Sequence, residues 1–320
     1  MLRLDPSEAL EWRAFKARLG AGVSLEDVLA CWEKNQATVK PMQLKPAIAA
    51  YTEAKKLESI AESTLAHYKP VFDRFLASFD GRDVASITRD DVSNWVGGLE
   101  MAQQSRKSHL SRIRSFFRWL RICRHIAEDP CEGMRRIKVV PKEIQLISPE
   151  HGAKLFGDNS KQEVADRREL CGRLALEAFI GIRFESVATI QAGDIKWDMK
   201  GILLPAARIK TRKRQFIQNL PANLWAWLKW SDPDSWSMTP RQYMQAKSLA
   251  FVRANVPHPR NCLRKCAATY HLAAFGNAGH TAAMLCHTSL AKLVNDYNGI
   301  ASAETGAKWF QILPPDPIQP

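Results

Sequence analysis

The feature that most constrains the fold is a helical hydrophobic period that runs through most of the chain. In residues 63–79 the apolar side chains gather near one helical face, at Leu65, Val71, Phe72, Phe75 and Leu76. Thr88 begins a capping-box sequence in front of a further helix, and Ser105 opens a longer one. Together with a helix over residues 44–57, these runs predict a small all-helical domain.

The second half of the chain keeps this period but includes one stretch of another kind. Ser148 is followed by a proline and begins a new helix, and the next helix covers about residues 164–180. From 194 to 220 the pattern changes to short apolar runs, which predict a small antiparallel sheet formed by residues 202–204, 207–209 and 216–220. Helices then resume, over residues 224–230, 240–254, 262–275, 281–286 and 290–297.

The charge balance indicates a polyanionic partner. With 46 Lys and Arg against 33 Asp and Glu, the formal net charge is +13, and nucleic acid is a common reason for such an excess. The sequence has no run of about eighteen apolar residues and no signal-peptide pattern, so we expect a cytoplasmic protein without a membrane partner.

The cysteines favour a reduced protein. They are seven in number and scattered, which is typical of core residues and not of a disulfide framework. Cys262 and Cys266 have His258 and His271 nearby, but they lie in one predicted helix without a second ligand pair of short spacing. We therefore expect no metal site.

The helix that Ser105 opens carries the densest positive charge. Its basic side chains include Arg106, Lys107, Arg112, Arg114, Arg118 and Arg121, and no acidic residue interrupts them. Leu110, Phe116 and Leu120 can pack on one side while the basic side meets phosphates. A solvated basic face is the alternative for a single helix. Because the charge continues into Arg135 and Arg136, we predict a sequence-independent grip on double-stranded DNA.

Three segments of the second domain hold polar residues suited to phosphate chemistry. They are, in chain order, Gly181-Ile-Arg183-Phe-Glu185 leading to Asp194, Arg208-Ile-Lys210-Thr-Arg212-Lys213, and Asn261-Cys-Leu-Arg264 followed by His287 and Tyr297. Breaking a phosphodiester without a metal requires a nucleophile, positive charge on the phosphoryl oxygens and a proton for the departing oxygen. Tyrosine, arginine and a lysine or histidine can supply them, provided that nearby cations help the phenol to ionise.

In this order the segments resemble the arginine boxes, the hairpin lysine, the histidine box and the tyrosine of the phage-integrase type of tyrosine recombinase. The resemblance extends over about residues 45–310, since the first domain also follows the family's order. It implies a mainly α, two-domain clamp of C shape. Its parts are a helical, SAM-like core-binding domain at 43–138, a linker at 139–147 that contains Pro141, and a mostly helical catalytic domain with a small antiparallel sheet at 148–320. Residues 1–42 form an N-terminal helical segment in this prediction. Its role is either that of an arm-type element or that of an oligomerisation element, and the sequence does not decide between them.

The family's mechanism, carried onto the matching residues, implies a role for each. Tyr297 attacks the scissile phosphate and forms a 3′-phosphotyrosine, which preserves the bond energy, so that rejoining needs neither ATP nor a metal ion. Arg183 and Arg264 clamp the phosphate. Lys210 protonates the leaving 5′ oxygen, and His287 supports the phosphate or the tyrosine proton.

Three departures from the family's pattern bear on activity. Asn261 stands where the family usually has a histidine, and it can donate a hydrogen bond but cannot act as an acid or base. Cys286 replaces the glycine that commonly precedes the second histidine, and Tyr297 comes one residue later than the commonest spacing. Arg212 and Lys213 beside the hairpin lysine are expected to contact DNA.

Structural interpretations of the same residues stay open. Arg183 can be the salt-bridge partner of Glu185 or Asp194, another base of the hairpin can replace Lys210, and His287 can cap a helix end. Tyr270 lies in the middle of a predicted helix, and we expect it to pack and not to act as a second nucleophile.

The sequence therefore predicts a site-specific recombinase or integrase that acts as a tetramer on two DNA sites, with the helix and tail after Tyr297 as the intersubunit contact. One alternative is a degenerate integrase-like protein that only binds DNA. Another is an enzyme of the type IB topoisomerase kind, which acts as a monomer without a special sequence. The DNA target, the direction of the reaction and any accessory proteins are not readable from the sequence.

Overall fold

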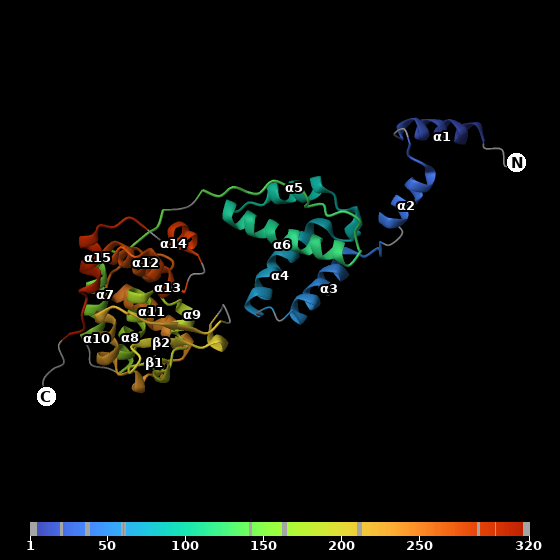
Figure 1. Cartoon of the computed structure of the whole chain (residues 1–320). Helices are drawn as coiled ribbons and strands as arrows, with labels where there is room; N and C mark the ends of the chain where they lie inside the picture. The colour runs from blue at the N-terminus through green and yellow to red at the C-terminus, as the bar shows by residue number, and fades with distance from the viewer. Residues whose placement is uncertain are drawn as a thin grey trace. The chain divides into compact units, whose positions relative to one another are not determined.

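A computed structural model of the chain describes residues 5–19, 22–35, 39–58, 60, 62–140, 143–161, 165–209, 213–286, 289–297 and 299–315 (Figure 1). The chain divides into two compact units, residues 1–141 and 142–320. The described part is mainly helical, with one small sheet, as the sequence predicts. None of its helices is long and apolar enough to cross a membrane.

In the described part of the first unit the regular elements are helices, with one isolated bridge. Its elements are α1 Pro6–Arg18, α2 Leu25–Asn35, α3 Leu44–Leu57, α4 Glu62–Phe79, the 3₁₀ turn η1 Val84–Ser86, α5 Arg89–Gly98 and α6 Gln103–Ile122. The predicted capping box at the start of α5 is confirmed, because Thr88 and Asp91 each accept the other's backbone N–H. The core is aromatic: Tyr51 of α3 meets Phe72 of α4 and Phe116 of α6 edge to face.

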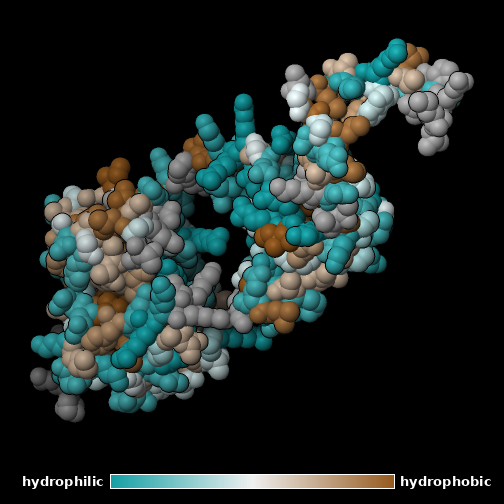
Figure 2. Space-filling view, turned by 45° about the vertical axis from the view of Figure 1, so that its right-hand side comes forward, coloured by the Kyte–Doolittle hydropathy of each residue, from teal (hydrophilic) through white to brown (hydrophobic). Residues whose placement is uncertain are grey.

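Helices α1 and α2 leave their apolar side chains in solvent. Leu10 is 67% exposed, Leu29 53% and Trp32 56%, whereas the buried core of the unit begins at Leu44 in α3. Figure 2 accordingly shows hydrophobic residues mixed with hydrophilic ones on the surface of these two helices.

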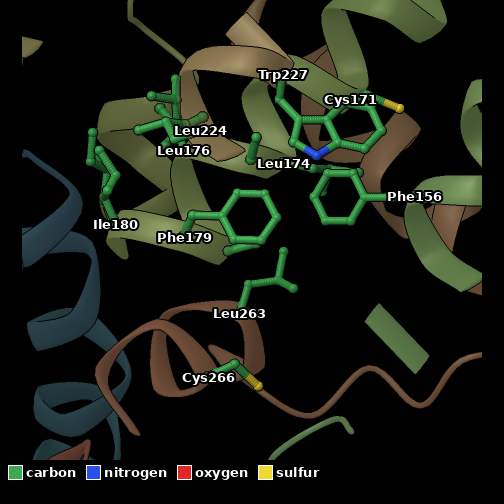
Figure 3. Close-up of a cluster of buried hydrophobic side chains, with 14 of the residues drawn as sticks. Phe156, Cys171, Leu174, Leu176, Phe179, Ile180, Leu224, Trp227, Leu263 and Cys266 are labelled. Atoms are coloured by element: carbon green, nitrogen blue, oxygen red, sulfur yellow. The ribbon is translucent and has the colours of Figure 1, made fainter. Parts of the chain in front are cut away.

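The second unit is built around two long buried helices, α8 Ala165–Ile180 and α12 Cys262–Phe275, which pack against each other. The other helices of this unit are α7 Pro149–Ser160, α9 Phe184–Val187, α10 Ala222–Ser231, α11 Pro240–Arg253, α13 Ala278–Met284, α14 Leu290–Asp296 and α15 Ala303–Phe310. Figure 3 shows the core, in which Phe156 stacks on Phe179, and Trp227 and Leu263 join them. All four side chains are at most 1% exposed, so α8 and α12 are rigidly placed.

The small sheet has the order β1-β2-β3, with β1 Ile195–Lys196, β2 Gly201–Leu204 and β3 Gln215–Ile217 all antiparallel. The prediction of a strand at 207–209 is wrong: Ala206–Arg208 form the 3₁₀ turn η3. Pro205 precedes this turn and has no N–H for a ladder. Arg208 is pulled inward, since it donates to the Thr189 carbonyl oxygen and pairs with Asp194, both at 2.6 Å.

Helix α15, after Tyr297, packs on its own unit. Trp309 is fully buried and its Nε1 donates to the Ala178 carbonyl oxygen of α8 at 2.9 Å. Gly306 approaches α12 so closely that a Cβ there would lie 2.7 Å from the Tyr270 carbonyl oxygen. The inner face of α15 is thus occupied by its own chain, and the intersubunit contact expected after Tyr297 stays a prediction.

Candidate active site

Arg264 lies in the first turn of α12 and joins three segments that are distant in sequence. It is 5% exposed. Its guanidinium donates to the Gly181 carbonyl oxygen through one nitrogen and to the Leu285 carbonyl oxygen, at 2.7 Å, through the other. Gly181 has a φ of 64°, and a Cβ there would overlap the Leu285 side chain, so glycine is required. Arg264 therefore ties the Gly181 segment to the Leu285 segment.

Tyr297 directly follows α14 and lies against Arg264. The guanidinium carbon is 5.0 Å from the centre of the half-buried Tyr297 ring. Burial and the charge of Arg183 together lower the pKa of Arg264 to about 10, against the opposing effects of the Tyr297 charge and a side-chain hydrogen bond with Tyr297. Arg264 thus stays charged at neutral pH and is a permanent cation beside the phenol.

Arg183 is the N-cap residue of α9 and is half-buried. Its charge lowers the pKa of Arg264, so the two guanidinium groups are close enough to repel each other. Among the described residues no ion pair forms with Arg183. Asp194, one of its suggested partners, is instead bound to Arg208 and accepts the Gln191 backbone N–H at 2.9 Å. Two arginines whose charges interact are suited to binding a phosphate between them.

Asn261 occupies the N-cap position of α12, three residues before Arg264. It is exposed, has a φ of 58° and makes no capping hydrogen bond. Its amide is therefore presented to solvent at the helix N-terminus, where backbone N–H groups favour an anion. Cys286, also at positive φ, lies close enough to Arg264 and Arg183 that both charges act on its pKa, which burial raises to about 11.

Lys210 and His287 lie outside the described residues, and so does Arg212 of the predicted DNA contacts. Their neighbours are placed: Arg208 and Ile209 precede Lys210, and Cys286 precedes His287. Lys213 is exposed. The structure thus brings Arg264 and Tyr297 into contact, with Arg183 near enough for its charge to act on Arg264. The roles of all the predicted site residues stay predictions.

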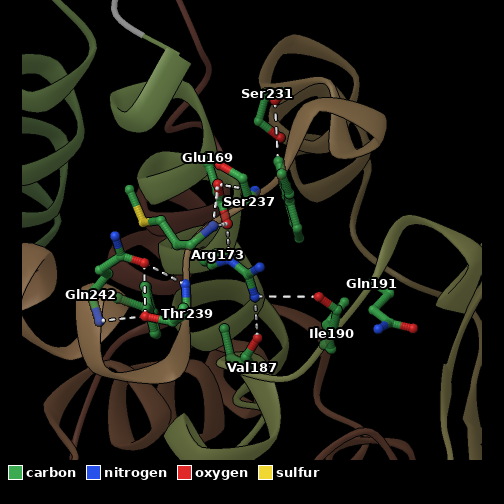
Figure 4. Close-up of polar contacts among 12 residues, drawn as sticks. Glu169, Arg173, Val187, Ile190, Gln191, Ser231, Ser237, Thr239 and Gln242 are labelled. Carbon is green, nitrogen blue, oxygen red and sulfur yellow. Dashed lines mark hydrogen bonds and ion pairs between the residues drawn. The ribbon is translucent and has the colours of Figure 1, made fainter.

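A buried ionic network holds the end of α9, the helix that Arg183 caps (Figure 4). Arg173 of α8 donates to the carbonyl oxygens of Val187, at 2.7 Å, and Ile190, at 3.3 Å. Its Nε bonds Glu169 at 2.7 Å, and Glu169 also accepts the Ser237 backbone N–H at the same distance. Arg173 and Glu169 are at most 4% exposed, so every charge here is compensated.

A second buried cluster supports the residue next to Arg183. Glu177 accepts the Tyr243 hydroxyl at 2.6 Å and pairs with Lys247. Tyr243 stacks on Phe184, with ring centres 5.7 Å apart and an interplanar angle of 14°. Sequence reasoning missed both clusters. The available signal was the repeat of charges at positions 169, 173 and 177, every four residues along an otherwise apolar helix.

The basic residues of α6 differ in their availability. Arg114 donates to the carbonyl oxygens of Met134 and Arg135, and Arg121 pairs with Glu132 at 2.8 Å. Arg112 is turned to Ser108 and lies 5.7 Å from the Tyr68 ring. Arg106 is half-buried. Lys107 and Arg118 are exposed and share a flank of the helix, because they are eleven residues, or about three turns, apart.

We expect the double variant Lys107→Ala/Arg118→Ala to bind double-stranded DNA more weakly and to reduce the slope of log affinity against log salt by about two, one for each phosphate contact. The measurement is a salt titration of binding by fluorescence anisotropy. Lys56→Ala/Lys69→Ala is the charge-matched control, since these lysines pair with Glu53 and Asp73 in the same unit. Equal slopes for the two double variants contradict the assignment of this flank.

Comparison with known proteins gives a consistent picture. The family model of the phage integrase N-terminal SAM-like domain matches residues 48–122, which run from α3 to α6. A curated tyrosine recombinase from Thermosipho africanus (strain TCF52B) is 23% identical over 146 residues. That match covers 43% of this chain and 50% of the relative, so only half the length of the relative is matched.

Solved integrase structures share the fold. The lambda integrase (75-356) dimer bound to a COC′ core site has a TM-score of 0.65 at 14% identity, over 80% of this chain and 96% of that chain. A lambda integrase tetramer bound to a Holliday junction also has a TM-score of 0.65 at 14% identity, over 94% and 90%. The Tn1549 transposon integrase with circular intermediate DNA has 0.62 at 10% identity, over 83% and 98%. The chain therefore has the fold of these integrases, and its residues 48–122 match the SAM-like domain of phage integrases.

Proposed function

We propose that the chain is a site-specific recombinase that cuts and rejoins double-stranded DNA, with Tyr297 as its nucleophile. The observation that carries the proposal is the position of the buried Arg264 guanidinium, 5.0 Å from the centre of the Tyr297 ring, with Arg183 near enough for the two charges to interact. A phenol that lies against a buried guanidinium is placed to attack a phosphate that the guanidinium holds.

In the proposed reaction the Tyr297 phenolate oxygen attacks the scissile phosphorus. The bond from phosphorus to the 5′ oxygen breaks, the protein acquires a 3′-phosphotyrosine, and Lys210 gives a proton to the departing 5′ oxygen, which leaves as a hydroxyl. Rejoining is the reverse attack by a 5′ hydroxyl on the phosphotyrosine. One phosphodiester is exchanged for another in each step, so no external energy source is required. Arg183 and Arg264 neutralise the phosphoryl oxygens as negative charge develops, and Asn261 and His287 add hydrogen bonds.

The proposed assembly is a tetramer on two DNA sites. The solved integrases with this fold include a dimer bound to a core site and a tetramer bound to a Holliday junction. In this chain the exposed basic flank at Lys107 and Arg118 supplies the non-specific phosphate contacts of the first unit.

The test uses a suicide substrate, a duplex from the flanks of the gene with a nick placed so that the cleaved fragment diffuses away. We expect a covalent protein–DNA band in EDTA and without ATP. Protein that binds this DNA but gives no band points to the degenerate binder. Relaxation of supercoiled plasmids without that site, by a monomer, points to the topoisomerase alternative.

A further inference from the structure

Thr269 lies on α12, five residues after Arg264, and holds the backbone on both sides of Asn298. Its hydroxyl donates to the Tyr297 carbonyl oxygen at 3.1 Å and accepts the Gly299 backbone N–H at 2.7 Å. The side chain is 1% exposed, so neither bond is exchanged for one to bulk water. One hydroxyl thus uses its donor and one of its two acceptor sites on the segment that carries the tyrosine.

The same segment is confined from its other side. A Cβ on Gly299 would lie 3.0 Å from the Leu146 Cδ1 atom and 3.4 Å from the Thr269 hydroxyl oxygen, so the backbone passes through a gap that suits glycine. Before the tyrosine, the Tyr297 N–H donates to the Leu293 carbonyl oxygen at 3.1 Å as the last bond of α14. Leu293 is the only fully buried described residue of α14, which makes that helix a weak anchor by itself.

We propose that Thr269 is a positioning residue, which fixes the tyrosine nucleophile to the helix that carries the phosphate-binding Arg264. Because both side chains belong to α12, which is packed against α8 and α15, one rigid element sets the distance between nucleophile and cation. The inference rests on the proposed role of Tyr297. It assigns to Thr269 no contact with DNA.

The test compares Thr269→Val, which keeps the shape but removes the hydroxyl, with Thr269→Ser, which keeps it. The readouts are the single-turnover rate of covalent complex formation at saturating protein, the affinity for the same DNA, and the melting temperature. A shift of the tyrosine by about 1 Å can cost on the order of 100-fold in rate. We expect Thr269→Val to form the complex roughly 10- to 100-fold more slowly with unchanged DNA affinity, and Thr269→Ser to recover most of the rate.

Thr281→Val is the matched control. Thr281 is also fully buried and its hydroxyl makes two hydrogen bonds, to the Asn277 carbonyl oxygen and to His271 Nδ1, both at 2.8 Å. It should lose similar stability but cleave at the wild-type rate below its melting temperature. Equal slowing of Thr269→Val and Thr281→Val, or wild-type cleavage by Thr269→Val, overturns the inference.

A second variant applies if Thr269→Val does not fold. Gly299→Ala presses on Leu146 and the Thr269 hydroxyl from the side of the loop and leaves the α12 core intact. This variant should slow cleavage with unchanged DNA affinity. Cleavage at the wild-type rate contradicts the positioning of Tyr297 by Thr269. If wild-type protein forms no covalent complex at all, the proposed function fails, whereas a wild-type complex with undiminished variants rejects only the role of Thr269.

Discussion

Tyr297→Phe should abolish the covalent protein–DNA complex, with a loss of roughly 10⁴-fold or more, because no other group replaces a missing nucleophile. Its affinity for DNA should stay within about twofold of wild type, since charged contacts to phosphates dominate binding. The ring remains, so its contact with Arg264 is kept. The measurement is the suicide-substrate assay, with a gel-shift titration of the same DNA.

Tyr270→Phe is the matched control for this prediction. Tyr270 is on α12 and its hydroxyl donates to the Ile147 carbonyl oxygen at 2.7 Å. Removal of that hydroxyl should cost about 1 kcal/mol of stability and leave the covalent complex intact. A complex that persists in Tyr297→Phe, or disappears only in Tyr270→Phe, assigns the chemistry to a different tyrosine.

Arg264→Lys should have the second largest effect. Lysine keeps the positive charge but cannot reach the Gly181 and Leu285 carbonyl oxygens together while also facing Tyr297, because it lacks the planar fork of donors. Loss of one such preorganised group costs about 10²- to 10³-fold in rate. We expect a decrease of that size in covalent complex formation, measured at saturating protein and well below the melting temperature.

Arg253→Lys controls for the loss of a guanidinium in general. Arg253 ends α11 and donates to the Asn159 side-chain oxygen at 2.9 Å. It has no place in the proposed chemistry, and its variant should cleave at the wild-type rate. Cleavage by Arg264→Lys at that same rate is incompatible with Arg264 as the phosphate clamp.

Much of the fold was predictable because local signals agree with tertiary packing. Residues 44–57 and 262–275 were predicted as helices with the bounds that α3 and α12 have. Their apolar faces are buried in two separate cores. The small sheet was readable from its short apolar runs, but the 3₁₀ turn at Ala206–Arg208 was not. That turn depends on Asp194 and Thr189, which contact Arg208 only in the folded chain.

The candidate site was predictable in its residue types but not in its partners. The helical pattern of α6 does not reveal that the segment after the helix, at Glu132 and Met134, engages Arg121 and Arg114. Likewise, Asp194 follows the Arg183 box in sequence but binds Arg208. Contacts between segments far apart in the chain decide these cases, and a periodic pattern contains no information about them.

The most direct test of the central claim is to identify the residue that becomes attached to DNA. The trapped complex is trimmed with nuclease, digested with trypsin and examined by tandem mass spectrometry. The peptide from residue 293 to Lys308 contains Tyr297 as its single tyrosine, while Tyr270 falls in a different peptide. The account predicts a nucleotide attached to Tyr297. A nucleotide on Tyr270 or on any other side chain contradicts it.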